Sequence, residues 1–180
     1  FELGFSTFFL NRTNRSGILS AGMIGGRHQS GNYRIDARFN KQDLIERIDF
    51  ISQYRDRIHL YNNDAIEFLE KVSPILNNNS LIYLDPPYVV KGKDLYLNHY
   101  TPEDHAQVSL AVANIQTPWI VTYDDVELIS QLYQGFKQEK FNLSYSASSK
   151  TRSGTEIMVF SDNLNIPESA EFFITPSQLV

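Results

Sequence analysis

Two short apolar runs, each ending on an acidic residue, constrain the fold of this 180-residue chain more than any other feature. Residues 80–84 read SLIYL and stop at Asp85, and residues 119–123 read WIVTY and stop at Asp124. Neither run alternates apolar with polar residues, which is typical of strands buried on both faces. Helical patterns separate the two runs. We therefore expect an α/β fold with an open, mainly parallel sheet and a ligand site beyond the carboxyl ends of its strands.

The spacing of apolar residues and the positions of turn residues predict the remaining elements. Asp64 is a good helix N-cap residue, and Thr101 followed by Pro102 opens another helix. The predicted helices cover residues 41–54, 65–72, 102–115 and about 126–133. Further predicted strands cover residues 58–61, 141–145 and 156–161, the last two forming a hairpin around the polar residues 146–154.

Residues 11–40 form a different kind of segment. They hold five of the nine glycines and little hydrophobic periodicity, which predicts a long irregular region. Residues 1–40 carry five arginines against two acids, whereas residues 61–180 carry seven lysines and arginines against fifteen acids. This asymmetry is compatible equally with a surface for a polyanion on the first segment and with a solvated loop.

Composition excludes several classes of function. The net charge of −5 argues against binding of nucleic acid over the whole surface. The absence of cysteine excludes disulfides, thiolate metal sites and cysteine nucleophiles, and the four histidines lack metal-ligand spacing, so no metal is expected. No window is apolar enough to span a membrane, and the first ten residues lack the features of a signal peptide. We expect a cytoplasmic protein without a membrane partner.

Asp85, Pro86, Pro87 and Tyr88 stand where an open α/β sheet keeps its active site. Proline has no N–H to donate and restricts the residue before it, so a rigid turn can leave the Pro86 carbonyl pointing outward beside the Asp85 carboxylate. Two fixed acceptors can hold an exocyclic amino group by both of its hydrogens. Tyr88 then offers a flat face on which an extruded base can stack. A strand-ending turn with a capping aspartate is the structural alternative.

The DPPY sequence at residues 85–88 resembles the catalytic motif of the D12 class of adenine-specific DNA methyltransferases, and the likeness extends over about residues 5–163. Other stretches that resemble the family are Asn11-Arg12-Thr13 with Ser16-Gly17-Ile18, Gly25-Gly26, Asn63-Asp64-Ala65, and Lys150-Thr151-Arg152 with Gly154-Thr155-Glu156.

This resemblance implies transfer of a methyl group from S-adenosylmethionine to the N6 amine of an adenine flipped out of duplex DNA. Asp85 and the Pro86 carbonyl would hold the amine, and Tyr88 would stack on the base. Methylation of cytosine N4 would use the same grip and is an alternative, as is a small-molecule or RNA substrate. Methylation at carbon 5 of cytosine is excluded because it needs a thiolate.

The resemblance also assigns residues to partners. Asp64, Ala65 and Asp85 would lie near the cofactor, with a helix N-cap as the second reading of Asp64. Tyr100 would cover the target or serve in packing. The implied DNA contacts are Asn11, Arg12, Arg15, Ser16, Arg27, Arg34, Lys150 and Arg152.

The chain departs from the family in one respect. The glycine-rich cofactor loop and the ribose-binding acid of the family are not found, and the cluster at residues 22–26 neither follows a strand nor opens a helix. We therefore expect residues 1–40 to be part of the DNA target-recognition region, 41–165 the carboxy-terminal part of a Rossmann-like methyltransferase domain that lacks its first strands, and 166–180 a tail. An amino-terminal part would be a further partner, and a truncated relative that binds DNA without catalysis is the alternative.

Overall fold

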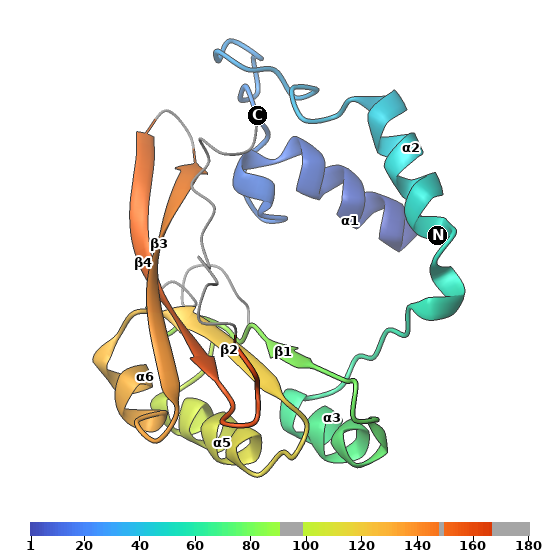
Figure 1. The fold of residues 1–180 in the computed structure, drawn as a ribbon. Coiled ribbons are helices and arrows are strands. Elements are labelled where there is room, and N and C mark those ends of the chain that lie inside the picture. The colour runs from blue at the N-terminus through green and yellow to red at the C-terminus, as the bar shows by residue number, and fades with distance from the viewer. Residues whose placement is uncertain (91–98, 148–149, 167–180) are drawn as a thin grey trace. The chain divides into compact units, whose positions relative to one another are not determined.

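The computed structural model describes residues 1–90, 99–147 and 150–166 (Figure 1). The chain divides into two compact units, Phe1–Tyr61 and Asn62–Val180. We call them the amino-terminal unit and the carboxy-terminal unit and describe each by itself. None of the helices in the described ranges has the length and apolarity that a membrane crossing requires.

The amino-terminal unit consists of helices joined by a long irregular segment. The helices are α1 (Glu2–Thr13), η1 (Arg15–Gly17), α2 (Lys41–Ser52) and η2 (Arg55–Arg57). The predicted helix from residue 41 is confirmed, and residues 18–40 are irregular as expected. Residues 11–13 were also expected to be irregular, which is wrong. They form the last turn of α1, where the Thr13 hydroxyl donates to the Phe9 carbonyl at 2.8 Å.

The strand predicted at residues 58–61 is also wrong. These residues are extended, but no described strand pairs with them, and Leu60 is 91% exposed. An apolar run becomes a strand only where a neighbouring strand accepts its backbone hydrogen bonds.

The carboxy-terminal unit holds a four-stranded sheet in the order β1-β2-β4-β3. Its strands are β1 (Ile82–Leu84), β2 (Trp119–Asp124), β3 (Lys137–Ala147) and β4 (Lys150–Phe160). β1 and β2 are parallel, whereas β4 is antiparallel to both β2 and β3. The sheet is therefore mixed, not mainly parallel as expected, because the predicted hairpin inserts its second strand beside β2.

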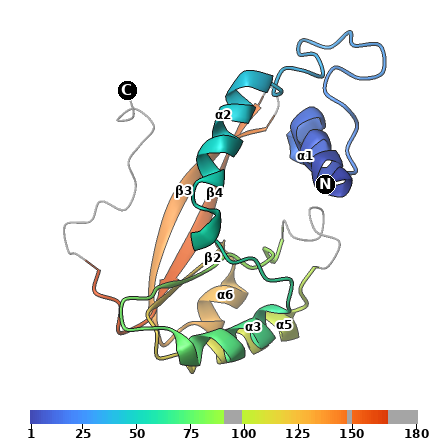
Figure 2. The same cartoon turned by 90° about the vertical axis from the view of Figure 1, so that its right-hand side faces the viewer.

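Three helices cover one face of this sheet. They are α3 (Ala65–Val72), α5 (Pro102–Ala113) and α6 (Glu127–Leu132), and Figure 2 shows them together on one side; the turn η3 (Ser73–Ile75) follows α3. The capping box that Thr101 makes with Asp104 confirms the predicted start of α5. Apolar residues from the helices and the sheet form the core between them, and its buried members are Leu69, Leu84, Val108, Val112, Trp119, Val121, Tyr123, Ile129, Tyr133, Ile157 and Val159.

Alternation along the strands assigns the other residues to the opposite face. In β2, Trp119, Val121 and Tyr123 face the helices, so Thr122 and Asp124 face away from them, and both are buried. β2 is therefore buried on both faces, as predicted. In β1 the prediction fails, because Tyr83 also faces away from the helices and is 59% exposed. This second face of the sheet carries polar side chains, and the site described below is built on it.

Candidate active site

The DPPY motif, residues 85–88, directly follows β1 at the carboxyl end of that strand. Asp85 is exposed, whereas Pro86, Pro87 and Tyr88 are half-buried. Among the described residues, no cation lies within ion-pair distance of Asp85. The carboxylate is therefore presented to solvent and is not engaged in an architectural ion pair.

A hydroxyl from β2 holds the Asp85 carboxylate. Thr122 Oγ1 lies 3.1 Å from Asp85 Oδ1, to which it can donate, and 2.9 Å from the hydroxyl of Tyr83. When Tyr83 donates to Thr122 and Thr122 donates to Asp85, the three groups form a chain of hydrogen bonds that ends on the carboxylate. Thr122 is 3% exposed, so its hydroxyl is protected from competing water.

Two buried carboxylates hold the residues after Asp85. Asp124 accepts hydrogen bonds from the backbone amides of Val89 and Val90, at 2.9 and 2.8 Å. Glu156 Oε2 accepts the hydroxyl hydrogen of Tyr88 at 2.8 Å. Asp124 and Glu156 lie opposite each other in the β2–β4 ladder and are 5% and 3% exposed. Burial, and next the hydrogen bond to Glu156, raise the pKa of Tyr88 above its usual range, so the phenol keeps the proton it donates.

A hollow of about 310 Å³ lies beside the motif. It lies between α3 and the carboxyl end of β1, and mostly apolar residues line it. They are Ala65, Phe68, Leu69, Ile82, Tyr83, Leu84, Asp85, Pro86, Pro87, Tyr100 and Val108. Mostly apolar walls with one carboxylate among them can accept a flat ring that carries a few polar groups.

Asp64 precedes the helix that lines this hollow and is its N-cap. Its Oδ1 atom accepts from the backbone amides of Ile66 and Glu67, at 2.9 and 3.4 Å. The predicted capping role is therefore confirmed. Burial, and next the negative charge of Asp64, raise the pKa of the Tyr100 phenol. The Asp64 charge thus acts on one of the residues that line the hollow.

A buried histidine packs against the ring of Tyr100. The His105 ring makes edge contacts with the rings of Tyr100 and Tyr123, both with centroids 5.4 Å apart. His105 is 1% exposed, and its burial lowers its pKa, so the ring is neutral at neutral pH. Packing is thus an observed role of Tyr100, one of the two readings of this residue from the sequence.

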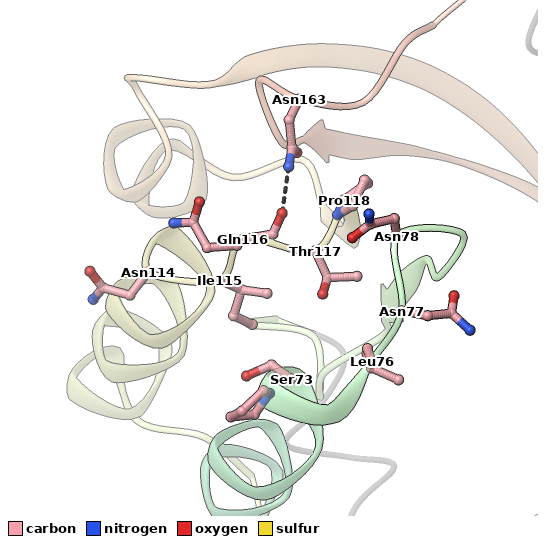
Figure 3. A pocket seen from close by; sticks show the side chains of 11 residues that line it. Ser73, Leu76, Asn77, Asn78, Asn114, Ile115, Gln116, Thr117, Pro118 and Asn163 are labelled. Carbon is pink, nitrogen blue, oxygen red and sulfur yellow. Dashed lines mark hydrogen bonds between the residues drawn. The ribbon is translucent and has the colours of Figure 1, made fainter.

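A second hollow, of about 630 Å³, lies at the opposite end of the strands (Figure 3). Pro118 precedes β2, and Asn163, which follows β4, donates to the Gln116 carbonyl at 2.6 Å. Amide and hydroxyl side chains line much of the hollow, together with Pro74, Leu76 and Ile115, and no charged side chain does. Since sheets of this class bind ligands at the carboxyl ends of their parallel strands, the hollow beside Asp85 is the better candidate for an active site.

The arginines proposed for DNA binding differ in their surroundings within the amino-terminal unit. Arg15, Arg27 and Arg34 are exposed, whereas Arg12 is half-buried and donates from Nε to the Arg38 carbonyl at 2.8 Å. Asn11 is exposed and donates to the Gly17 carbonyl at 3.1 Å, and exposed Ser16 has a positive φ of 55°. Arg12 and Asn11 thus stabilise the segment, and three arginines face solvent.

The Gln29 side chain stabilises the irregular segment through hydrogen bonds, a role that was not predicted from the sequence. Its side-chain nitrogen donates to the carbonyls of Ile24 and Gly26, and its oxygen accepts from the Ile35 amide. Gly25 has a φ of +83°, and a Cβ there would lie 2.8 Å from the Tyr33 carbonyl oxygen. The segment therefore has a defined conformation that requires glycine at position 25.

Lys150 and Arg152 belong to β4, in register with Ala147 and Tyr145 of β3. Their side chains lie outside the described part of the chain. The described residues contain no group of three or more histidine, aspartate or glutamate side chains arranged to hold a metal ion.

Sequence reasoning gave no role to Thr122 or Asp124, and it named Glu156 only as part of a family-like stretch. The signal was present in β2, where Thr122 and Asp124 interrupt an apolar strand at a spacing of two. Polar residues at that spacing share a face, and buried polar groups require partners.

A family comparison places the chain among known proteins. No curated protein matches it. The family of D12 class N6 adenine-specific DNA methyltransferases matches residues 4–147, a range that includes most of α1, the irregular segment and the DPPY motif. The chain therefore belongs to the D12 class of N6 adenine-specific DNA methyltransferases.

Proposed function

We propose that this chain transfers a methyl group from S-adenosylmethionine to the N6 amine of an adenine flipped out of duplex DNA. The observation that carries the proposal is the environment of Asp85. Its carboxylate is exposed and free of any ion pair in the described ranges, is held by Thr122, and borders an apolar hollow. Family membership supports the same reaction.

In this proposal Asp85 and the Pro86 carbonyl accept the two hydrogens of the adenine amine. Their grip draws the nitrogen toward tetrahedral geometry and frees its lone pair for attack. Bound S-adenosylmethionine supplies the methyl group as an electrophile on a sulfonium sulfur. The hydrogen bond from Thr122 fixes the Asp85 carboxylate before the base arrives, so little reorganisation is needed during the reaction.

Tyr88 would stack on the flipped adenine. Base–aromatic stacking contributes about 1–3 kcal/mol, which offsets part of the few kcal/mol needed to unstack a base from the duplex. The hydrogen bond from the Tyr88 hydroxyl to Glu156 holds the far end of the ring at the sheet. Pro87 would contribute only to the stiffness of the turn.

The cofactor would lie in the hollow beside the motif. Ala65, Phe68 and Tyr100 would offer apolar surface to its adenine ring, and the negative charge of Asp64 acts on Tyr100. Asp85 borders this hollow as well, so it can lie close to both the cofactor and the target base.

Duplex DNA would bind through the arginine-rich segment. Arg15, Arg27 and Arg34 are exposed and can contact phosphates or guanine edges, and exposed Ser16 can approach the site that the flipped base leaves. Asn11 and Arg12 would act by stabilising the segment. Lys150 and Arg152, near the hairpin tip, would contact the DNA backbone.

Incorporation of a labelled methyl group into DNA tests the proposal. The substitution Asp85→Ala should abolish transfer and leave DNA affinity within a few-fold, because Asp85 acts on one amine. Asp162→Ala, which removes an exposed aspartate of the same unit, is the matched control and should retain transfer. The assay should be run on this chain and on the full translation product of its gene. DNA binding without transfer in both would favour a non-catalytic DNA-binding relative, and an active Asp85→Ala protein would contradict the amine grip.

A further inference from the structure

Two carboxylates of the sheet bind Tyr88 and the backbone that follows it. Asp124 binds the backbone immediately after Tyr88, through the amides of Val89 and Val90. Glu156 binds the far end of the Tyr88 side chain, through the phenol oxygen. The ring of Tyr88 therefore lies between two fixed points.

Burial of these two carboxylates in the sheet is unfavourable in free energy. Asp124 and Glu156 are both almost completely buried and lie opposite each other on β2 and β4. Burying a carboxylate is unfavourable unless hydrogen bonds replace its water, and two like charges side by side increase the cost. Apolar side chains at these two positions would cost less free energy to bury. We therefore attribute the two acids to the groups that they bind, the Tyr88 hydroxyl and the amides of Val89 and Val90.

We propose that Glu156 is a positioning residue that fixes the orientation of the Tyr88 ring, so that the ring is ready to stack on the target base before the base arrives. A tyrosine side chain has two torsions, and a hydrogen bond from its hydroxyl to a buried carboxylate restricts both. Asp124 restricts the backbone from which those torsions start. This inference rests on the proposed function of Tyr88 and adds the residue that orients it.

The chemistry of the pair supports the assignment. The pKa of Tyr88 is raised by burial and by Glu156, so the phenol remains a donor throughout the pH range in which the protein would work. A ring oriented in advance loses less conformational entropy when the base binds, which is the usual benefit of a preorganised site.

Three variants separate positioning from support of the fold. Glu156→Ala removes the acceptor, Glu156→Gln keeps one in its amide oxygen, and Tyr88→Phe keeps the ring but removes the donor. Glu139→Gln, which changes a more exposed carboxylate of β3, is the matched control. Each protein is first compared with wild type by thermal unfolding.

The first readout is the Tyr88 ring itself, observed by NMR of protein carrying ¹³C-labelled tyrosine and assigned with Tyr88→Phe. We expect the wild type and Glu156→Gln to give one ordered set of Tyr88 ring signals, and Glu156→Ala to give averaged or broadened signals. Unchanged ring signals in Glu156→Ala would overturn the inference. Should Glu156→Ala not fold, a loss of Tyr88 ring order in Glu156→Gln under mild destabilisation with urea, without a change at Tyr123, decides in its favour. Equal loss at both rings decides against it.

The second readout is methyl transfer, measured for kcat and KM separately. Glu156→Ala should lower kcat by about tenfold or more, since small misplacements in an active site can cost about 100-fold. Affinity for S-adenosylmethionine should stay within about twofold, and Glu156→Gln should recover most of kcat. In the Tyr88→Phe background, Glu156→Ala should have little further effect on kcat, and an additive loss would contradict the inference. If the wild type transfers no methyl group, the proposed function fails, and the ring signals still decide the role of Glu156.

Discussion

Thr122 Oγ1 lies 3.1 Å from Asp85 Oδ1, so the middle of β2 supports the first residue of the DPPY motif through one hydroxyl. The two residues are on neighbouring parallel strands, Thr122 within β2 and Asp85 directly after β1. The carboxylate is exposed, yet the group that holds it is buried. Hydrogen bonds to charged groups contribute about 1.5–3 kcal/mol, enough to fix the carboxylate in one orientation.

Replacing Thr122 by valine should therefore reduce methyl transfer. Thr122→Val keeps the shape of the side chain but removes the donor, and we expect kcat to fall by about tenfold, equal to roughly 1.4 kcal/mol in activation free energy. Thr122→Ser keeps the hydroxyl and should retain most of kcat. Single-turnover transfer to DNA measures the effect. An unchanged kcat in Thr122→Val, with an unchanged melting temperature, would show that the hydrogen bond does not contribute.

Two substitutions separate the capping role of Asp64 from its proposed role in cofactor binding. Asp64→Ala should lower the free energy of unfolding by about 1 kcal/mol, because α3 loses its N-cap. Asp64→Ser is also a good N-cap and should keep stability within a few tenths of a kcal/mol. If the carboxylate also binds the cofactor, S-adenosylmethionine should bind both variants more weakly, as measured by calorimetry. Wild-type affinity in Asp64→Ser would leave Asp64 with the capping role alone.

The arginines of the amino-terminal unit should fall into two groups. Arg27→Ala and Arg34→Ala remove exposed charges and should weaken DNA binding, and each should reduce the slope of log affinity against log salt by roughly 1. Arg12→Ala removes the hydrogen bond to the Arg38 carbonyl and should lower stability by about 1 kcal/mol. Fluorescence anisotropy over a salt series and thermal unfolding measure the two effects. A salt slope that is unchanged in Arg27→Ala and Arg34→Ala would remove these residues from the DNA contacts.

His105 should make the protein less stable in mild acid. Its burial lowers its pKa from the ordinary value of 6.5, although the nearby carboxylates of Asp124 and Asp104 act in the opposite direction. As the pH falls below 6.5, the unfolded chain takes up a proton on this histidine that the folded chain does not. The free energy of unfolding should therefore decrease with falling pH, by at most about 1.4 kcal/mol per pH unit, and the decrease should end below the folded-state pKa.

Urea unfolding between pH 5 and 7.5 tests this expectation. His105→Gln should show a weaker pH dependence than the wild type over this range, whereas His28→Gln, which changes an exposed histidine, should retain the wild-type dependence. Equal pH dependence in the wild type and His105→Gln would contradict the assignment.

Local sequence signals predicted most elements of the carboxy-terminal unit. The caps at Asp64 and Thr101 mark the starts of α3 and α5, and the apolar run before Asp124 is a buried strand. These features depend on residues close together in the chain, so the sequence expresses them directly.

Features that depend on distant partners were missed or misjudged. Residues 58–61 have the composition of a strand but no described neighbour to pair with. The support of the DPPY motif joins residues that are 34–68 positions apart, such as Tyr88 with Glu156 and Val90 with Asp124. Gln29 likewise could not be recognised, since its three hydrogen bonds depend on how the chain turns around it. The position of the motif at the carboxyl end of a strand was predictable, and the residues that hold it were not.

Because the strands differ in length, one part of the sheet has only two strands. β2 is in register with β4 only from Ile120–Phe160 to Asp124–Glu156, whereas β3 and β4 continue to pair as far as Ala147 and Lys150. Among the described residues of this unit, the outer part of the hairpin has no third strand beside it. Beyond Glu156, β4 is therefore supported by β3 alone. Lys150 and Arg152 lie in this outer part of β4, on the same strand as Glu156, whose carboxylate accepts the hydroxyl hydrogen of Tyr88. One continuous strand therefore joins this two-stranded part of the sheet to the residue that binds the Tyr88 hydroxyl.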